Sequence, residues 1–176
     1  MKDKIVKYLE GIRDYSLKYH NHKETAAWAG LAFYAVFCGT FTRTKFTGEY
    51  AYCLNIGFTI LILLVALLLY FYIKNQFDLK DVATSYFSAS MSLLLEVLLK
   101  EEKDIKPNEY LALDNDSGDT ELASTHFLPQ KVLETAKTMK TKGAGAARKT
   151  KRLAYIILIT VTVGTVVFQW FGTSKP

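Results

Sequence analysis

Three long stretches without a charged residue constrain the fold of this chain more than any other feature. They run over residues 25–42, 50–73 and 153–174, and charged residues flank each of them. A helix needs about 20 mainly apolar residues to cross roughly 30 Å of bilayer hydrocarbon. A soluble helix as apolar as the second or third stretch would have to be buried on every face. The sequence therefore predicts an all-α integral membrane protein with three transmembrane helices.

Two segments leave alternatives open. Residues 25–42 form a short stretch rich in Ala and Thr, so a buried or re-entrant helix is the alternative to a span. Residues 82–99 have a still shorter uncharged core, which favours a buried or interfacial helix over a fourth span or a re-entrant helix. The apolar residues of this second segment form an amphipathic stripe of Leu79, Val82, Tyr86, Leu93 and Val97.

The distribution of Lys and Arg predicts the orientation, because basic residues near the ends of spans stay on the cytoplasmic side. The chain carries six of them before residue 25, two in 43–49, thirteen in 74–152 and one after residue 174. With three spans, the two basic regions lie on one side of the membrane. We therefore expect a multi-pass protein of the cell (inner) membrane with a cytoplasmic N-terminus and an extracytoplasmic C-terminus.

The organisation outside the spans follows from the charge pattern. An amphipathic helix precedes the first span, a short external loop joins the first two spans, and a cytoplasmic helical segment joins the last two. The expected boundaries are 1–24 for the amphipathic helix, 25–42 for transmembrane helix 1, 43–49 for the external loop, 50–73 for transmembrane helix 2, 74–152 for the cytoplasmic segment with an acidic loop at 101–121, and 153–174 for transmembrane helix 3.

The N-terminal helix carries one stripe at spacings of three and four residues. It can pack on the other cytoplasmic helices or lie on lipid headgroups. In the 74–152 segment a helix is expected to resume at Pro129. The core of that segment would be small, so we expect the N-terminal helix or a second subunit to complete it. The first stripe comprises Ile5, Leu9, Ile12, Ser16 and Tyr19, and the second comprises Leu128, Val132, Ala136 and Met139.

Basic residues before the third span are candidates for contact with anionic lipid headgroups. They can also serve simply as the positive anchor of that span. No aromatic residues alternate with them, so nucleic acid is not an expected partner. The candidates are Lys140, Lys142, Arg148, Lys149, Lys151 and Arg152.

Two further sets are candidates for packing and polar contact. Ala26 with Gly30 and Ala35 with Gly39 have the small-xxx-small spacing that lets helices approach closely. His20, His22 and Glu24 form a candidate polar cluster. The two histidines are two residues apart and point to different sides of a helix, so they cannot share a metal ion.

No motif for catalysis, phosphate binding or metal binding is present, and no cofactor or metal is expected. The acidic residues from Asp114 to Glu121 fail the register of a helix-loop-helix calcium site. We therefore expect a non-enzymatic membrane component that interacts or signals through its cytoplasmic helices, with a homo-oligomer or another membrane protein as partner. The alternative is an oligomeric pore-forming or membrane-perturbing effector, for which the pore-lining candidates are Thr59, Thr160, Thr162 and Thr165.

Overall fold

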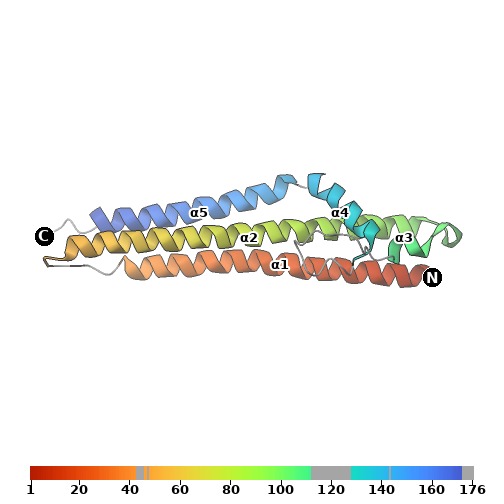
Figure 1. Cartoon of the computed structure of the whole chain (residues 1–176), viewed down its shortest axis with the longest axis horizontal. Helices are drawn as coiled ribbons and strands as arrows, with labels where there is room; N and C mark the ends of the chain where they lie inside the picture. The colour runs from red at the N-terminus through yellow and green to blue at the C-terminus, as the bar shows by residue number, and fades with distance from the viewer. Residues whose placement is uncertain (43–45, 47, 112–127, 143, 172–176) are drawn as a thin grey trace. The chain divides into compact units, whose positions relative to one another are not determined.

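The computed structural model describes residues 1–42, 46, 48–111, 128–142 and 144–171, with the side chains of 141–147 left out. Every regular element in these ranges is a helix (Figure 1). The helices are α1 (Lys2–Phe41), α2 (Ala51–Leu99), the short 3-10 helix η1 (Glu102–Asp104), α3 (Pro107–Leu111), α4 (Gln130–Lys142) and α5 (Ala144–Phe171).

The chain divides into two compact units. Unit 1 comprises Met1–His22 and Leu79–Gly145, and unit 2 comprises Lys23–Asp78 and Ala146–Pro176. Helices α1 and α2 contribute to both units without a break. The separate helices expected over 1–24 and 25–42 are thus one helix, because nothing between them, neither Pro nor Gly, interrupts the hydrogen-bonding pattern.

Unit 1 has an aliphatic core to which α1, α2 and α4 contribute. The stripe on α1 supplies Ile5 and Leu9, which are completely buried, and Ile12. The stripe that resumes after Pro129 supplies Val132 and Ala136. The N-terminal helix therefore completes the core of the later segment within one chain. The same core includes Ala89, Leu93, Leu94, Val97, Ile105 and Tyr110.

The beginning of α1 also caps the C-terminal end of α2. Lys2 Nζ donates hydrogen bonds to the carbonyl oxygens of Leu98 at 3.0 Å and Lys100 at 2.8 Å. The amino group of Met1 pairs with Glu102 at 3.3 Å. Carbonyl groups in the last turn of a helix lack partners within the helix, so these contacts satisfy groups that would otherwise need water.

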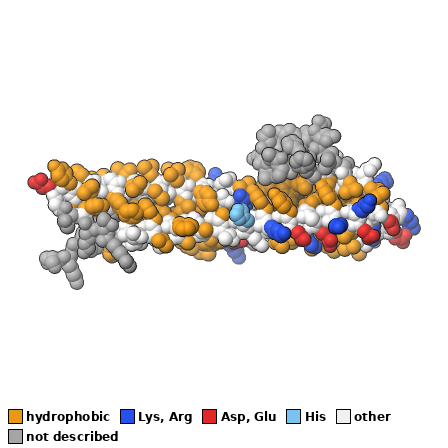
Figure 2. Space-filling view, turned by 90° about the horizontal axis from the view of Figure 1, so that it is seen from below, with side chains coloured by type: hydrophobic (Ala, Val, Ile, Leu, Met, Phe, Trp, Pro, Cys, Tyr) orange, Lys and Arg blue, Asp and Glu red, His pale blue; other side chains and the backbone are white. Residues whose placement is uncertain are grey.

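Unit 2 packs parts of α1, α2 and α5 around a second core. Its buried residues come from all three helices: Ala27, Leu31, Tyr34, Cys38, Ile73, Phe77, Ala154 and Leu158. Its outer surface is apolar as well. On the face shown in Figure 2, hydrophobic side chains cover this unit, whereas charged side chains gather over the unit that holds the N-terminus.

Two helices are long and apolar enough to cross a membrane: Ala51–Leu99 and Arg148–Phe171. Only 11% and 28% of their most apolar windows are buried, so they are unlike the core helices of a soluble protein. The stretch expected as transmembrane helix 1 lies in α1, which is not one of these two helices.

Helix α2 is longer than a membrane requires. Its 49 residues extend over about 73 Å at about 1.5 Å per residue, more than twice the hydrocarbon thickness. The segment 82–99 forms its second part and belongs to unit 1, where Leu93 and Val97 are buried. Its apolar stripe is therefore covered by protein. Of the expected acidic loop, 101–111 forms η1 and α3, and 112–121 lies outside the described residues.

Candidate functional site

A polar cluster connects three elements of unit 1 at a single carboxylate oxygen. Glu96 Oε1, on α2, accepts hydrogen bonds from Lys100 Nζ at 2.7 Å, Tyr110 OH at 2.8 Å and Lys131 Nζ at 2.9 Å. Tyr110 lies on α3, and its side chain is completely buried. Lys131 lies on α4 with its Nζ 4.1 Å from the centre of the Tyr110 ring, which adds a cation–π contact. We call these four residues the Glu96 cluster.

The electrostatics of the Glu96 cluster keep it charged. Hydrogen bonding from Lys100, supported by Lys131 and Tyr110, outweighs desolvation and lowers the pKa of Glu96 to about 2. Hydrogen bonds to Glu96 and Tyr110 raise the pKa of Lys100. Desolvation lowers the pKa of Lys131, but its bonds to Tyr110 and Glu96 outweigh that effect and the net shift is upward. The arrangement is suited to holding α2, α3 and α4 together rather than to proton transfer near neutral pH.

Sequence analysis alone did not identify the Glu96 cluster. Glu96 is the only charged residue within 82–99, and Lys100 follows it at the i, i+4 spacing of helical ion pairs. A lone carboxylate in an apolar helix needs a partner, so this signal was available. Tyr110 and Lys131 are 14 and 35 residues away from Glu96, and only the tertiary fold brings them to it.

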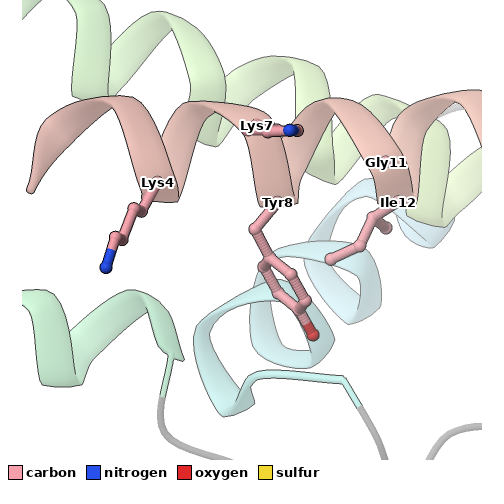
Figure 3. A pocket seen from close by; sticks show the side chains of 5 residues that line it. All are labelled: Lys4, Lys7, Tyr8, Gly11 and Ile12. Atoms are coloured by element: carbon pink, nitrogen blue, oxygen red, sulfur yellow. The ribbon is translucent and has the colours of Figure 1, made fainter.

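An open groove of about 510 Å³ runs along α1 in unit 1 (Figure 3). Among the described residues, Ile12 and the half-buried Tyr8 give it an apolar lining, and Lys4, Lys7 and Gly11 also line it. Burial raises the pKa of Tyr8. Lys4 and Lys7 are exposed, so the groove combines an apolar floor with a positively charged rim.

The candidate polar cluster is divided between the two units. His20 Nδ1 lies 2.9 Å from Thr84 Oγ1, so within unit 1 it links α1 to α2. His22 is exposed on α1, and Glu24 belongs to unit 2. Over the described part of the chain, no three His, Cys, Asp or Glu residues lie close enough to hold a metal ion.

The basic candidates before the third span differ in their surroundings. Lys151 pairs with Asp78 of α2, within unit 2. The side chain of Lys142 lies outside the described residues. The four that are exposed, and therefore open to a headgroup, are Lys140, Arg148, Lys149 and Arg152.

The small-residue pairs also differ. A Cβ atom on Gly30 would lie 3.2 Å from side-chain atoms of both Leu69 and Tyr72, so α1 and α2 approach closely there. Gly39 has no neighbouring atom within 4 Å of such a position, and Ala35 is exposed. Ala26 is half-buried. The close approach is therefore at Gly30.

Neutral polar side chains connect the helices of unit 2. Tyr34 OH and Thr162 Oγ1 are 2.9 Å apart, Trp170 Nε1 donates to Thr59 Oγ1 at 3.0 Å, and Gln169 Nε2 donates to Asn55 Oδ1 at 3.3 Å. We call these three contacts the polar seam. Of the four threonines considered for a pore, Thr59 and Thr162 belong to this seam, Thr165 is buried, and Thr160 is exposed.

Comparisons do not add a relative from which a function could be transferred. No family model matches the chain, and neither a curated protein nor a solved structure matches it at a significant level.

Proposed function

We propose that this chain is a membrane anchor with a cytoplasmic interaction or signalling platform, and that it has no catalytic activity. Unit 2 is the anchor and unit 1 is the platform. The observation that carries this proposal is the change of outer surface between the two units. Most of the exposed large apolar side chains belong to unit 2, whereas unit 1 has a core of its own and carries most of the charged side chains on the face shown in Figure 2.

The exposed apolar faces also support three spans. On α1, Phe33 and Val36 are 77% and 68% exposed, although the same helix buries Leu31 in the core. Helices α2 and α5 also expose apolar side chains, such as Leu68 at 70% and Ile159 at 61%. A face of this kind is favourable against lipid and unfavourable in water. We therefore propose that residues 25–42 span the membrane together with 50–73 and 153–174.

The proposed orientation places unit 1 in the cytoplasm. Its support is the excess of Lys and Arg in residues 1–24 and 74–152. A reporter that is active only outside the cytoplasm should be active when fused after Pro176 and silent when fused after Ser117. Activity after Ser117 would contradict the orientation, and silence after Pro176 would contradict an odd number of spans.

Photo-crosslinking in native membranes tests the function. A photoreactive residue at Lys7 or Glu134, both exposed in unit 1, should give discrete protein adducts. The same residue at Phe33 or Leu68 of unit 2 should give mainly lipid adducts. Lack of any protein adduct from unit 1 would contradict an interaction platform. Ion flux in liposomes that contain the purified chain alone would favour the alternative, an oligomeric pore.

A further inference from the structure

The charged end of unit 2 brings two rows of polar side chains together, one on α2 and one on α5. Tyr70, Lys74 and Asp78 follow one another at four-residue spacing, which places them on one side of α2. Both ends of this row contact α5, because the rings of Tyr70 and Tyr155 lie 5.0 Å apart and Asp78 pairs with Lys151. Lys74 is one turn from each of these contacts, so it lies between them beside α5.

The row on α5 adds another cation. Arg148 lies one turn before Lys151, on the side of α5 that contacts α2. Lys74 and Arg148 are both exposed, and neither has an ion-pair partner among the described residues. We call five residues of the two rows the Lys74 surface: Tyr70, Lys74, Asp78, Arg148 and Lys151. Its three cations outnumber its one carboxylate, which is already paired, so the surface attracts an anion.

Hydroxyl groups lie beside these cations, toward the uncharged stretches of the sequence. The hydroxyl group of Tyr155 is buried without a hydrogen-bond partner in the described ranges. Tyr70 is exposed, and within the same ranges its hydroxyl group has no partner either. A phosphate group has enough acceptor oxygens to bind two cations and a hydroxyl group at once. The exposed hydroxyl of Tyr70 is the one that such a group can reach.

The position of the Lys74 surface along the helices indicates where the phosphate comes from. Lys74 directly follows the uncharged stretch 50–73, and Arg148 shortly precedes the stretch 153–174. If these stretches span the membrane, the surface lies at the level of the headgroups, where tyrosine rings are common. Basic residues between membrane helices on the cytoplasmic side bind the headgroups of anionic lipids.

We propose that the Lys74 surface binds the phosphate group of an anionic lipid. Lys74 and Arg148 are the cations that hold the phosphate, and the Tyr70 hydroxyl donates a hydrogen bond to it. Lys151 stays paired with Asp78 and holds the two helices together at the site. This inference rests on the proposed function, since it requires unit 2 in the membrane, and it involves residues of unit 2 alone.

Lipid binding to the purified full chain in a mild detergent tests the site. Phosphatidylglycerol or phosphatidylcholine is titrated onto the chain, and bound lipid is counted by native mass spectrometry. Phosphatidylglycerol should bind about tenfold more tightly, because the choline group of the other lipid offsets the charge of its phosphate. Equal binding of the two lipids would overturn the proposal.

Single substitutions distinguish a defined site from general attraction by positive charge. Lys74→Gln and Arg148→Gln should each weaken phosphatidylglycerol binding about fivefold. Lys149→Gln is the matched control, because it removes the same charge from an exposed position that is two residues from Lys151 and therefore on another side of α5. Its effect should be less than about twofold. Equal losses for Lys74→Gln and Lys149→Gln would overturn the site.

Two further variants separate loss of the site from loss of folding. Tyr70→Phe should weaken binding about threefold by removing one hydrogen bond, whereas Tyr72→Phe, at an exposed position on another side of α2, should not. Asp78→Asn should strengthen binding about fivefold, because it releases Lys151 to the phosphate. A misfolded chain would not bind the lipid more tightly, so failure of Asp78→Asn to strengthen binding would overturn the proposal.

Soluble phosphate is the other source of the same chemistry. A large excess of inorganic phosphate should leave phosphatidylglycerol bound, and displacement of the lipid would overturn the assignment to a membrane lipid. Extraction of native membranes with alkaline carbonate separates this inference from the proposed function. A chain that stays in the membrane but does not distinguish the two lipids contradicts only the lipid site. A chain that is extracted contradicts the membrane anchor as well.

Discussion

Units 1 and 2 use the same helices, α1 and α2, and differ in what they place outside and in how polar groups link their helices. Unit 2 exposes Phe33, Leu68 and Ile159, and joins its helices through the neutral polar seam. Unit 1 has a core of the same aliphatic kind, but its helices are joined by the charged Glu96 cluster. The apolar cores alone would not distinguish the two units.

If unit 2 lies in the membrane, as proposed above, the surrounding solvent explains this difference. Charged groups pay a smaller desolvation cost where water reaches their outer atoms, although water also screens their attraction, and the side chains of Glu96 and Lys131 are 34% and 27% exposed. In hydrocarbon a charged side chain is costly, so hydroxyl, amide and indole groups serve between helices instead. An ion pair of unit 2, between Lys151 and Asp78, lies outside the uncharged stretches of the sequence.

The largest effect is expected from charges placed in the core of unit 1. Replacing Ile5, Leu9 and Ile12 by Glu removes roughly 1.5–3 kcal/mol of apolar burial for each side chain and adds the cost of buried charge. Unit 1 should become sensitive to protease in native membranes. The matched control is Tyr15→Glu with Leu17→Glu on the same helix, where both positions are exposed and resistance should persist. Equal resistance of the triple variant would contradict the packing of α1 in unit 1.

A charged residue on the surface of unit 2 tests whether that surface faces lipid. Leu64 is 54% exposed near the middle of the second apolar stretch, so Leu64→Asp would be tolerated on a soluble protein. In a membrane it should disfavour insertion by about 3–4 kcal/mol, from the difference between Leu and Asp at the centre of a span. The measurement is the fraction of chain extracted from membranes by alkaline carbonate. Leu17→Asp, at an exposed position of unit 1, is the control. Equal extraction of the two variants would contradict the proposal that unit 2 faces lipid and unit 1 faces water.

The pH dependence of unit 1 tests the Glu96 cluster. The pKa of Glu96 is about 2 in the folded chain and lower than in the unfolded chain, so its stabilising contribution is complete above the unfolded pKa. It should be lost as the pH falls from about 4.5 toward 2. Glu96→Gln should lower the stability of unit 1 by about 1 kcal/mol at neutral pH, because the site is partly exposed.

The measurement is the protease resistance of unit 1 as a function of pH, compared between the original chain and its variants. Glu96→Gln should reduce the loss of resistance between pH 4.5 and 2, whereas Glu134→Gln on the exposed side of α4 should leave it as in the original chain. Identical profiles for the original chain and Glu96→Gln would show that the cluster does not stabilise unit 1.

Sequence patterns predicted the elements of each unit better than the contacts between them. The helical class and the stripes on α1 and α4 could be predicted because spacings of three and four residues are a local property. In 82–99 the predicted stripe contains Leu93 and Val97, which are buried. It does not include Leu95, Leu98 and Leu99, which are exposed. Periodicity predicts which side of a helix is buried. It does not predict what the opposite side of the helix contacts.

Contacts that bring distant residues together could not be predicted in the same way. The hydrogen bond between Tyr34 and Thr162 joins residues 128 positions apart. Spacing within a single helix also could not decide which small pair supports packing: Gly30 lies against α2, whereas Ala35 and Gly39, which have the same spacing, do not contact it closely. Which side of α1 faces α2 depends on how the helices pack.

The smallest effect is expected inside unit 2, where a neutral hydrogen bond is removed. Tyr34→Phe deletes the hydroxyl group that lies 2.9 Å from Thr162 Oγ1 and leaves the ring in the core. Hydrogen bonds between membrane helices contribute about 0.6 kcal/mol on average, so the thermal midpoint in detergent should fall only slightly. Thr162 still donates to the carbonyl oxygen of Leu158 at 2.7 Å, which limits the cost of its lost partner. Tyr50→Phe is the control, because Tyr50 is 74% exposed. A loss for Tyr34→Phe as large as that of a buried ion pair, about 3–5 kcal/mol, would mean that the polar seam carries more of the stability of unit 2 than neutral contacts should, and the contrast with unit 1 would fail.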